Sequence, residues 1–130
     1  MLRRVWIDDW QMQCCGDPFR VGSQVQFSTT QSLDTDYFSD VLGPDAAAAL
    51  TDYEDHHDLD VGPMARLIGT VERIEAIFCQ YGRRGQTLYP MAGTTQVDLR
   101  DKATGWESEH EDEDAGLRFV GYVVTVATDV

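Results

Sequence analysis

Two adjacent pairs of metal-binding side chains stand out in the sequence. Cys14 and Cys15 follow one another in the N-terminal region, and His56 and His57 follow one another well downstream. Thiolate sulfur and imidazole nitrogen are the ligands that zinc prefers, and four such groups complete a tetrahedral site. The sequence therefore predicts a candidate zinc site at these four residues, and zinc is the only cofactor that it indicates.

The spacing within each pair argues against all four side chains binding one ion. Neighbouring side chains on an extended backbone point to opposite faces, and structural zinc sites separate paired cysteines by roughly two to four residues. A site with one cysteine, one histidine and nearby carboxylates fits the geometry better. The nearest carboxylates are Asp17, Asp55 and Asp58. The simpler interpretation treats the cysteines as small, buried apolar residues.

The same two pairs could instead form a thiol nucleophile and its base. Either cysteine would attack, and either histidine would accept the proton. A reactive thiol needs electropositive surroundings that lower its pKa, whereas the residues around this segment are acidic: Asp8, Asp9 and Asp17. The sequence contains no Gly-x-Ser-x-Gly elbow, no phosphate-binding glycine pattern and no EF-hand loop. No catalytic residue is predicted.

Composition predicts a single soluble domain over residues 1–130. The chain has 23 acidic and 10 basic residues, for a formal net charge of −13. This sign repels phosphate backbones and anionic lipid surfaces, so binding to duplex nucleic acid or to a membrane is not expected. It favours high solubility and, if there is a protein partner, a basic one.

The N-terminus and the cysteines predict a cytoplasmic setting. Acidic residues follow Arg3 and Arg4 before an apolar region can form, which does not resemble a signal peptide. No apolar run approaches the roughly 18 residues of a membrane span. The three cysteines include an adjacent pair, which is a poor disulfide framework and suits a reducing compartment.

Apolar alternation and β-branched residues predict strands at 3–7, 21–27, 94–99 and 117–126. The last of these is apolar on both faces, which is typical of a central strand. A glycine-bounded basic turn at 82–85 predicts a hairpin into residues 86–89, and Pro90 ends that strand.

Residues 64–81 fit two secondary structures. Their apolar residues recur at helical spacing, but Gly69, Thr70 and Val71 are poor helix formers in the middle of the segment. A long bent strand, with a bulge near Glu72 and Arg73, fits the same residues. We expect the strand. The predicted fold class is therefore mainly β, a small bent antiparallel barrel (SH3-like or OB-like) with one short helical acidic insertion; the alternative is an α+β fold with a helix at 64–81.

Two segments concentrate the acidic residues. Residues 30–62 form the predicted acidic insertion, with Pro44 and Asp45 at a helix start and a helix that could extend to Asp55. The histidine pair would then follow the C-terminal end of that helix, where histidine is favoured. Residues 105–115 are predicted to form an acidic loop.

Four aromatic residues crowd the N-terminal region: Trp6, Trp10, Phe19 and Phe27. We interpret them as core or rim packing. An exposed tryptophan among them would mark a binding patch, because tryptophan is enriched at interaction hot spots.

The segment 6–22, with its string Trp-Gln-Met-Gln-Cys-Cys-Gly, resembles a family of small bacterial proteins, domain of unknown function 6578 (DUF6578). Further similarity lies in residues 53–57, 69–74 and 119–122. The resemblance implies a bacterial, cytoplasmic protein with one compact domain and no assigned activity. It also places the cysteine pair and the histidine pair in one signature, which favours the metal hypothesis.

The leading functional hypothesis is a non-enzymatic small β domain that binds a protein or ligand, with a metal at Cys14, Cys15, His56 or His57. One alternative is a metal- or thiol-dependent enzyme that uses these residues. The other is an acidic neutraliser of a basic partner, such as an immunity protein or a nucleic-acid mimic.

The metal hypothesis predicts stoichiometric zinc in protein purified without added metal, because a closed cysteine–histidine site retains its ion. Elemental analysis measures this directly. Protein of full purity that contains no zinc or other transition metal would rule the site out.

Overall fold

A computed structural model describes residues 1–14, 17–55, 64–107 and 116–129 of the chain. Strands and short helices follow one another as β1 (Leu2–Asp8), α1 (Asp9–Cys14), β2 (Phe19–Arg20), β3 (Gln24–Thr30), α2 (Thr35–Leu42), α3 (Pro44–Ala48), β4 (Asp52–Glu54), β5 (Ala65–Arg84), β6 (Thr87–Pro90), β7 (Gln96–Arg100), β8 (Lys102–Ala103) and β9 (Leu117–Ala127). None of the described helices has the length and apolar character needed to cross a membrane.

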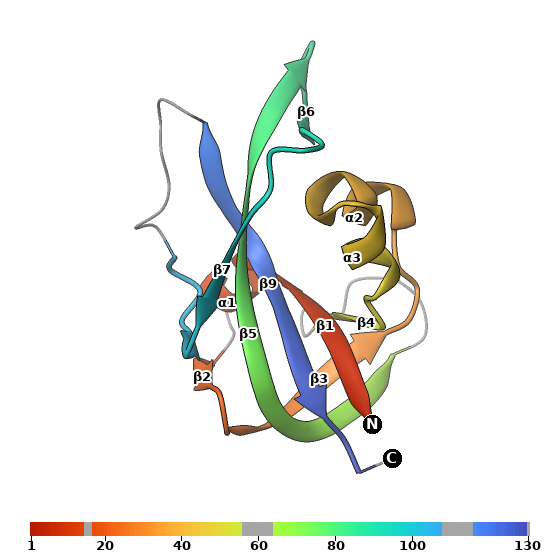
Figure 1. Cartoon of the computed structure of the whole chain (residues 1–130), viewed down its shortest axis with the longest axis vertical. Helices are drawn as coiled ribbons and strands as arrows, with labels where there is room; N and C mark the ends of the chain where they lie inside the picture. The colour runs from red at the N-terminus through yellow and green to blue at the C-terminus, as the bar shows by residue number, and fades with distance from the viewer. Residues whose placement is uncertain (15–16, 56–63, 108–115, 130) are drawn as a thin grey trace.

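The predicted mainly β fold is confirmed, and its strand pairings form a ring. The order along the sheet is β3–β4–β1–β9–β5, and β5 pairs back with β3 (Figure 1). The sheet is mixed: β1 and β4 pair in parallel, whereas the other strand pairs of the ring are antiparallel. The shortest strand of the ring is β4, with 3 residues.

Residues 65–84 form one strand, so the prediction of a bent strand is confirmed and the alternative helix at 64–81 is wrong. β5 is 20 residues long and pairs in turn with β3, β9, β7 and β6. The predicted bulge is present, as a register shift between Val71 and Arg73. Hydrogen bonding to strands along both edges of β5 stabilises the extended conformation in spite of the helical spacing of its apolar residues. Gly69 permits β9 to approach closely, because a Cβ there would lie 2.3 Å from the Ala127 carbonyl oxygen.

The acidic segment is partly helical as predicted, but a helix that continues to Asp55 is wrong. α3 ends at Ala48, and residues 52–54 form β4 instead. Tertiary contacts explain the change: the Thr51 amide donates to the Arg4 carbonyl at 2.9 Å, and Arg3 donates twice to the Asp52 carboxylate at 2.8 Å. These bonds hold the segment extended beside β1.

The sheet has an apolar cluster on each face. Inside the ring, the cluster includes Val5, Ile7, Phe78 and Tyr122. The second cluster, with Trp6 and Phe38, lies between the sheet and α2, which stands beside the sheet with α3 (Figure 1). Because side chains alternate along β1, Trp6 and Asp8 both point to this helix-covered face.

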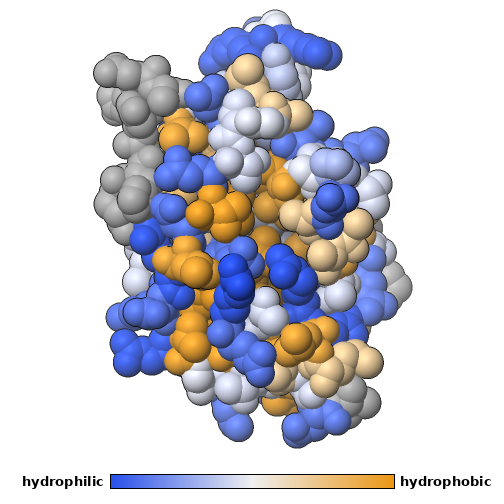
Figure 2. Space-filling model, in the orientation of Figure 1, coloured by the Kyte–Doolittle hydropathy of each residue, from blue (hydrophilic) through white to orange (hydrophobic). Residues whose placement is uncertain are grey.

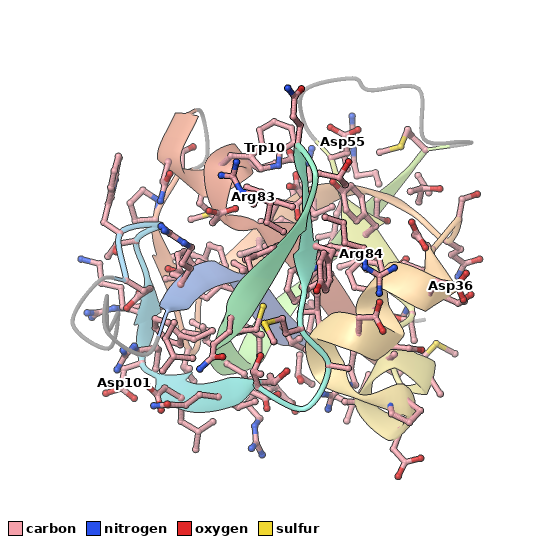
Figure 3. The ribbon with its side chains drawn as sticks, turned by 90° about the horizontal axis from the view of Figure 1, so that it is seen from above. Trp10, Asp36, Asp55, Arg83, Arg84 and Asp101 are labelled. Atoms are coloured by element: carbon pink, nitrogen blue, oxygen red, sulfur yellow. The ribbon has the colours of Figure 1, made fainter. Side chains whose placement is uncertain are left out.

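The predicted hairpin is confirmed as β5 and β6, which extend from the body as a two-stranded ribbon (Figure 1). Arg83 and Arg84 lie near its tip (Figure 3), and the Arg84 guanidinium lies 5.0 Å from the centroid of the Tyr89 ring. On the face seen in Figure 2, apolar side chains form several separate patches divided by polar ones. That face offers no single continuous apolar surface.

A buried polar network anchors the segment that precedes residue 108. The Tyr122 hydroxyl donates to Glu107 at 2.8 Å and accepts from the Gly105 amide at 2.9 Å, while Arg100 donates to the other Glu107 oxygen at 3.0 Å. This network fixes the segment against β9.

Gly121→Ala should lower the free energy of unfolding by about 1–3 kcal/mol through overpacking. An added Cβ would lie 2.6 Å from the Ile7 carbonyl oxygen and 2.7 Å from Trp6 Cζ2. Urea denaturation measures the effect. Gln24→Ala, at an exposed strand position, is the control and should stay within about 0.5 kcal/mol of the parent; equal stability of both variants would contradict this packing.

Candidate functional site

Only one of the four predicted metal ligands falls within the described residues. Cys14 is the last residue of α1, whereas Cys15, His56 and His57 lie outside the described part of the chain, as does Asp58. Within 1–14, 17–55, 64–107 and 116–129, no group of three or more His, Cys, Asp or Glu side chains is arranged to hold a metal ion. The zinc site therefore stays a prediction.

The described residues that flank the two predicted ligand pairs lie close together. The Gln11 side-chain amide donates to the Glu54 carbonyl at 3.0 Å, and this bond is buried. It joins α1, which leads to Cys14, to the end of β4, which leads to Asp55. Figure 3 shows Trp10 of α1 and Asp55 on the same side of the molecule.

The predicted packing role is confirmed for three of the four N-terminal aromatic residues. Trp6 is fully buried, and Phe19 packs edge-on against Phe27 with ring centroids 5.5 Å apart. Trp10 differs, because β1 ends at Asp8 and Trp10 lies in α1 with 40% of its surface exposed.

The chemistry at this face centres on Asp8, the last residue of β1. Trp6 Nε1 donates to Asp8 Oδ1 at 2.8 Å, and the Tyr53 hydroxyl donates to Asp8 Oδ2. Asp8 pairs with Gly121 of β9, and the missing side chain of that glycine leaves room for the Trp6 indole.

Burial raises the pKa of the Asp8 carboxyl above its ordinary value of 3.8, and the nearby Asp55 carboxylate acts in the same direction. The hydrogen bonds from Trp6 and Tyr53 oppose this rise without cancelling it. Burial and the bond to Asp8 also raise the pKa of Tyr53, so its hydroxyl remains protonated and donates. Among the described residues, no basic side chain forms an ion pair with Asp8.

A pocket of about 270 Å³ opens beside this carboxylate. We call it the Asp8 pocket, and it is lined by Asp8, Ser32, Asp34, Tyr37, Phe38 and Tyr53. Helix α2 supplies the rings of Tyr37 and Phe38, and Asp34 caps this helix by accepting from the Tyr37 amide at 3.1 Å. The aromatic wall is thus held in place by a helix start packed on the sheet.

Behind the aromatic wall, the Tyr37 and Tyr81 hydroxyls lie 3.4 Å apart. Cys79 is fully buried nearby in the same apolar cluster, and burial raises the pKa of its thiol to about 11. A thiol with a raised pKa is a poor nucleophile at neutral pH. Cys79 therefore has a packing role, and a thiol chemistry would need another cysteine.

A second, larger concavity of about 910 Å³ lies between the end of β3 and the start of β5. Its lining includes Arg3 and Asp52, but these two side chains neutralise each other through two hydrogen bonds of 2.8 Å. The Asp8 pocket is the better functional candidate because its carboxylate has no such counter-charge among the described residues.

Comparison with known proteins gives one match. The family model described as a family of unknown function, DUF6578, matches residues 1–128. The chain belongs to the DUF6578 family. No curated protein and no solved structure matched it.

Sequence reasoning about this DUF6578 member missed the Asp8 pocket, although one signal was available. Asp8 stands two residues after Trp6 in a strand, so both side chains point to the same face. An acidic residue beside a buried tryptophan on an apolar face is unusual and points to a specific hydrogen bond. Tyr53 carries no comparable local signal, because its contact with Asp8 depends on the short pairing of β4 with β1.

Asp8→Asn should gain stability relative to the parent protein as pH rises above 3.8. Because the folded-state pKa of Asp8 is raised, the folded chain binds its proton more tightly than the unfolded chain, and the stability of the parent falls as pH rises above 3.8. The asparagine variant lacks this pH-dependent loss, while its single amide oxygen cannot accept from both Trp6 and Tyr53, a cost that is the same at every pH. Urea denaturation at several pH values measures the difference in stability between the two proteins, and a difference that does not change with pH would contradict the prediction.

Proposed function

We propose that this domain is a non-enzymatic binding module that takes a cationic group into the Asp8 pocket. One observation carries the proposal: a carboxylate on a half-buried residue opens into an aromatic pocket, and no basic side chain among the described residues neutralises it. An ionised carboxylate that is removed from water is costly unless a positive charge approaches it. A cationic ligand would supply that charge.

The size of the pocket supports a small group. Sites for drug-sized ligands measure roughly 300–1,000 Å³, and the Asp8 pocket measures about 270 Å³. It therefore suits a single cationic head group, either of a small molecule or of a side chain on a basic partner.

The charge around the pocket supports the same ligand class. The segment that caps and forms α2 and α3 carries four exposed acidic residues: Asp34, Asp36, Asp40 and Asp45. The sequence contains no lysine or arginine between residues 21 and 65. Such a surface attracts cations over distances comparable with the Debye length of about 8 Å at physiological salt. It supports a basic partner as well.

Three cations with the same tail test the proposal: butylammonium, butylguanidinium and butyltrimethylammonium. Two-dimensional NMR should show at least one of them shifting the amide signals of residues 32–38 and 53 at millimolar concentration, since a single head group binds weakly. The uncharged 1-pentanol should produce much smaller shifts.

Asp8→Asn should weaken the binding of that cation by about tenfold or more, because it removes the charge of the half-buried Asp8 carboxylate from the pocket. Asp101→Asn is the matched control, since it removes one exposed charge on the opposite side of the molecule from Asp36 (Figure 3). Binding of none of the three cations, or equal binding by Asp8→Asn and the parent, would contradict the proposal.

A further inference from the structure

The hydrogen-bonding capacity of Asp8 restricts which cation it can receive. A carboxylate offers about four lone-pair positions on its two oxygens. Trp6 donates to one oxygen of the Asp8 carboxylate, and Tyr53 donates to the other. About one acceptor position therefore remains on each oxygen. The forked bond of a guanidinium group would have to share both oxygens with these two donors, so Asp8 is poorly prepared to bind one.

The other polar groups of the pocket add little acceptor capacity at depth. The Tyr37 hydroxyl pairs with Tyr81 at 3.4 Å, and Asp34 Oδ1 accepts from the Tyr37 backbone amide. Ser32 and Asp34 are exposed residues at the rim. A primary ammonium that entered the pocket would bring three N–H donors, and at least one of them would lose its water partner without replacement.

Three aromatic rings line the pocket and can attract a cation without accepting a hydrogen bond. The Tyr37 and Phe38 centroids lie 5.3 Å apart at an interplanar angle of 72°. Those of Phe38 and Tyr53 lie 6.4 Å apart at 53°. Tyr37 therefore meets Phe38 edge to face, Phe38 and Tyr53 are inclined to each other, and all three residues line the pocket. Aromatic walls attract cations through their negative faces and require no N–H donor.

From these observations, and on the basis of the proposed function, we infer that the cation is a methylated ammonium group with at most one N–H. Its charge is balanced by Asp8, its methyl groups contact the rings of Tyr37, Phe38 and Tyr53, and its single donor, if present, uses an acceptor position that remains on Asp8. A permanently charged or tertiary ammonium meets all three conditions, whereas a guanidinium group meets only the first.

Acidic residues at the rim of the pocket restrict the class of ligand further. Asp34 lines the pocket and Asp36 lies exposed on the same helix. A carboxylate or phosphate attached close to the ammonium would be repelled by these side chains. The ligand is therefore a methylated ammonium without an adjacent anion, either a free small cation or a methylated lysine side chain on a basic segment.

The test measures dissociation constants by NMR titration of the intact chain with a methylation series. The affinity should increase from butylammonium through butyldimethylammonium to butyltrimethylammonium, by about tenfold across the series, and butylguanidinium should bind most weakly. Phosphocholine should bind more weakly than butyltrimethylammonium. A basic peptide with one trimethyllysine, compared with its unmodified form, distinguishes a side-chain ligand from a free cation.

Two substitutions of Tyr37 distinguish the contribution of its ring from an effect on folding. Tyr37→Leu should lose more of the methylation preference than Tyr37→Phe, since only the leucine variant removes a ring. Circular dichroism verifies that each variant is folded. If butylguanidinium or butylammonium binds most tightly, the inference is overturned while the proposed cation site stands. If no cation binds, the proposed function itself fails.

Discussion

The arrangement of the Asp8 pocket depends on how the Trp6 indole lies on the sheet. Its ring crosses β9 where Gly121 has no side chain, and its N–H then reaches Asp8 at 2.8 Å. Phe38 of α2 packs edge-on against the same indole, with centroids 5.3 Å apart. The indole thus orients the Asp8 carboxylate and provides the packing surface for α2, which supplies Tyr37 and Phe38 to the pocket. A larger residue at 121 would disturb both at once.

The two faces of the sheet differ in what they contribute to stability and to binding. Inside the ring, apolar side chains fill the space between β1, β5 and β9, and this cluster stabilises the fold. On the helix-covered face, a carboxylate with a raised pKa interrupts the apolar surface. Groups of this kind are costly for folding and are concentrated at functional sites. The contrast with Asp52, which has Arg3 as a direct partner, indicates that Asp8 is not placed for structural charge balance.

Sequence patterns predicted the longer strands well. β1 follows from its β-branched and aromatic residues, β9 from a run that is apolar on both faces, and the β5–β6 hairpin from its glycine-bounded basic turn. The bulge near Glu72 and Arg73 was predicted as part of the bent strand. The predicted helix was wrong for residues 52–54, because the local helix signals at Pro44 do not reveal the hydrogen bond from the Thr51 amide to the Arg4 carbonyl. Hydrogen bonds between distant parts of the chain determine where a strand as short as β4 forms.

The candidate site was harder to predict because its parts are far apart in the chain. Asp8 and Tyr53 meet only through the parallel pairing of β1 with β4, which no local pattern encodes. The cysteine and histidine pairs attracted attention because adjacent ligands are conspicuous in a sequence. The residues that define the pocket are ordinary in type, and only their burial and partners distinguish them.

The most direct measurement of the central claim is the pKa of Asp8 itself, followed by carbon-detected NMR of its carboxyl group. In the free protein, that pKa should lie above its ordinary value, since burial disfavours the charged form. Saturation with butyltrimethylammonium should lower it, because a bound cation favours the carboxylate and the linkage is reciprocal. A pKa that does not change on addition of the cation would contradict the account.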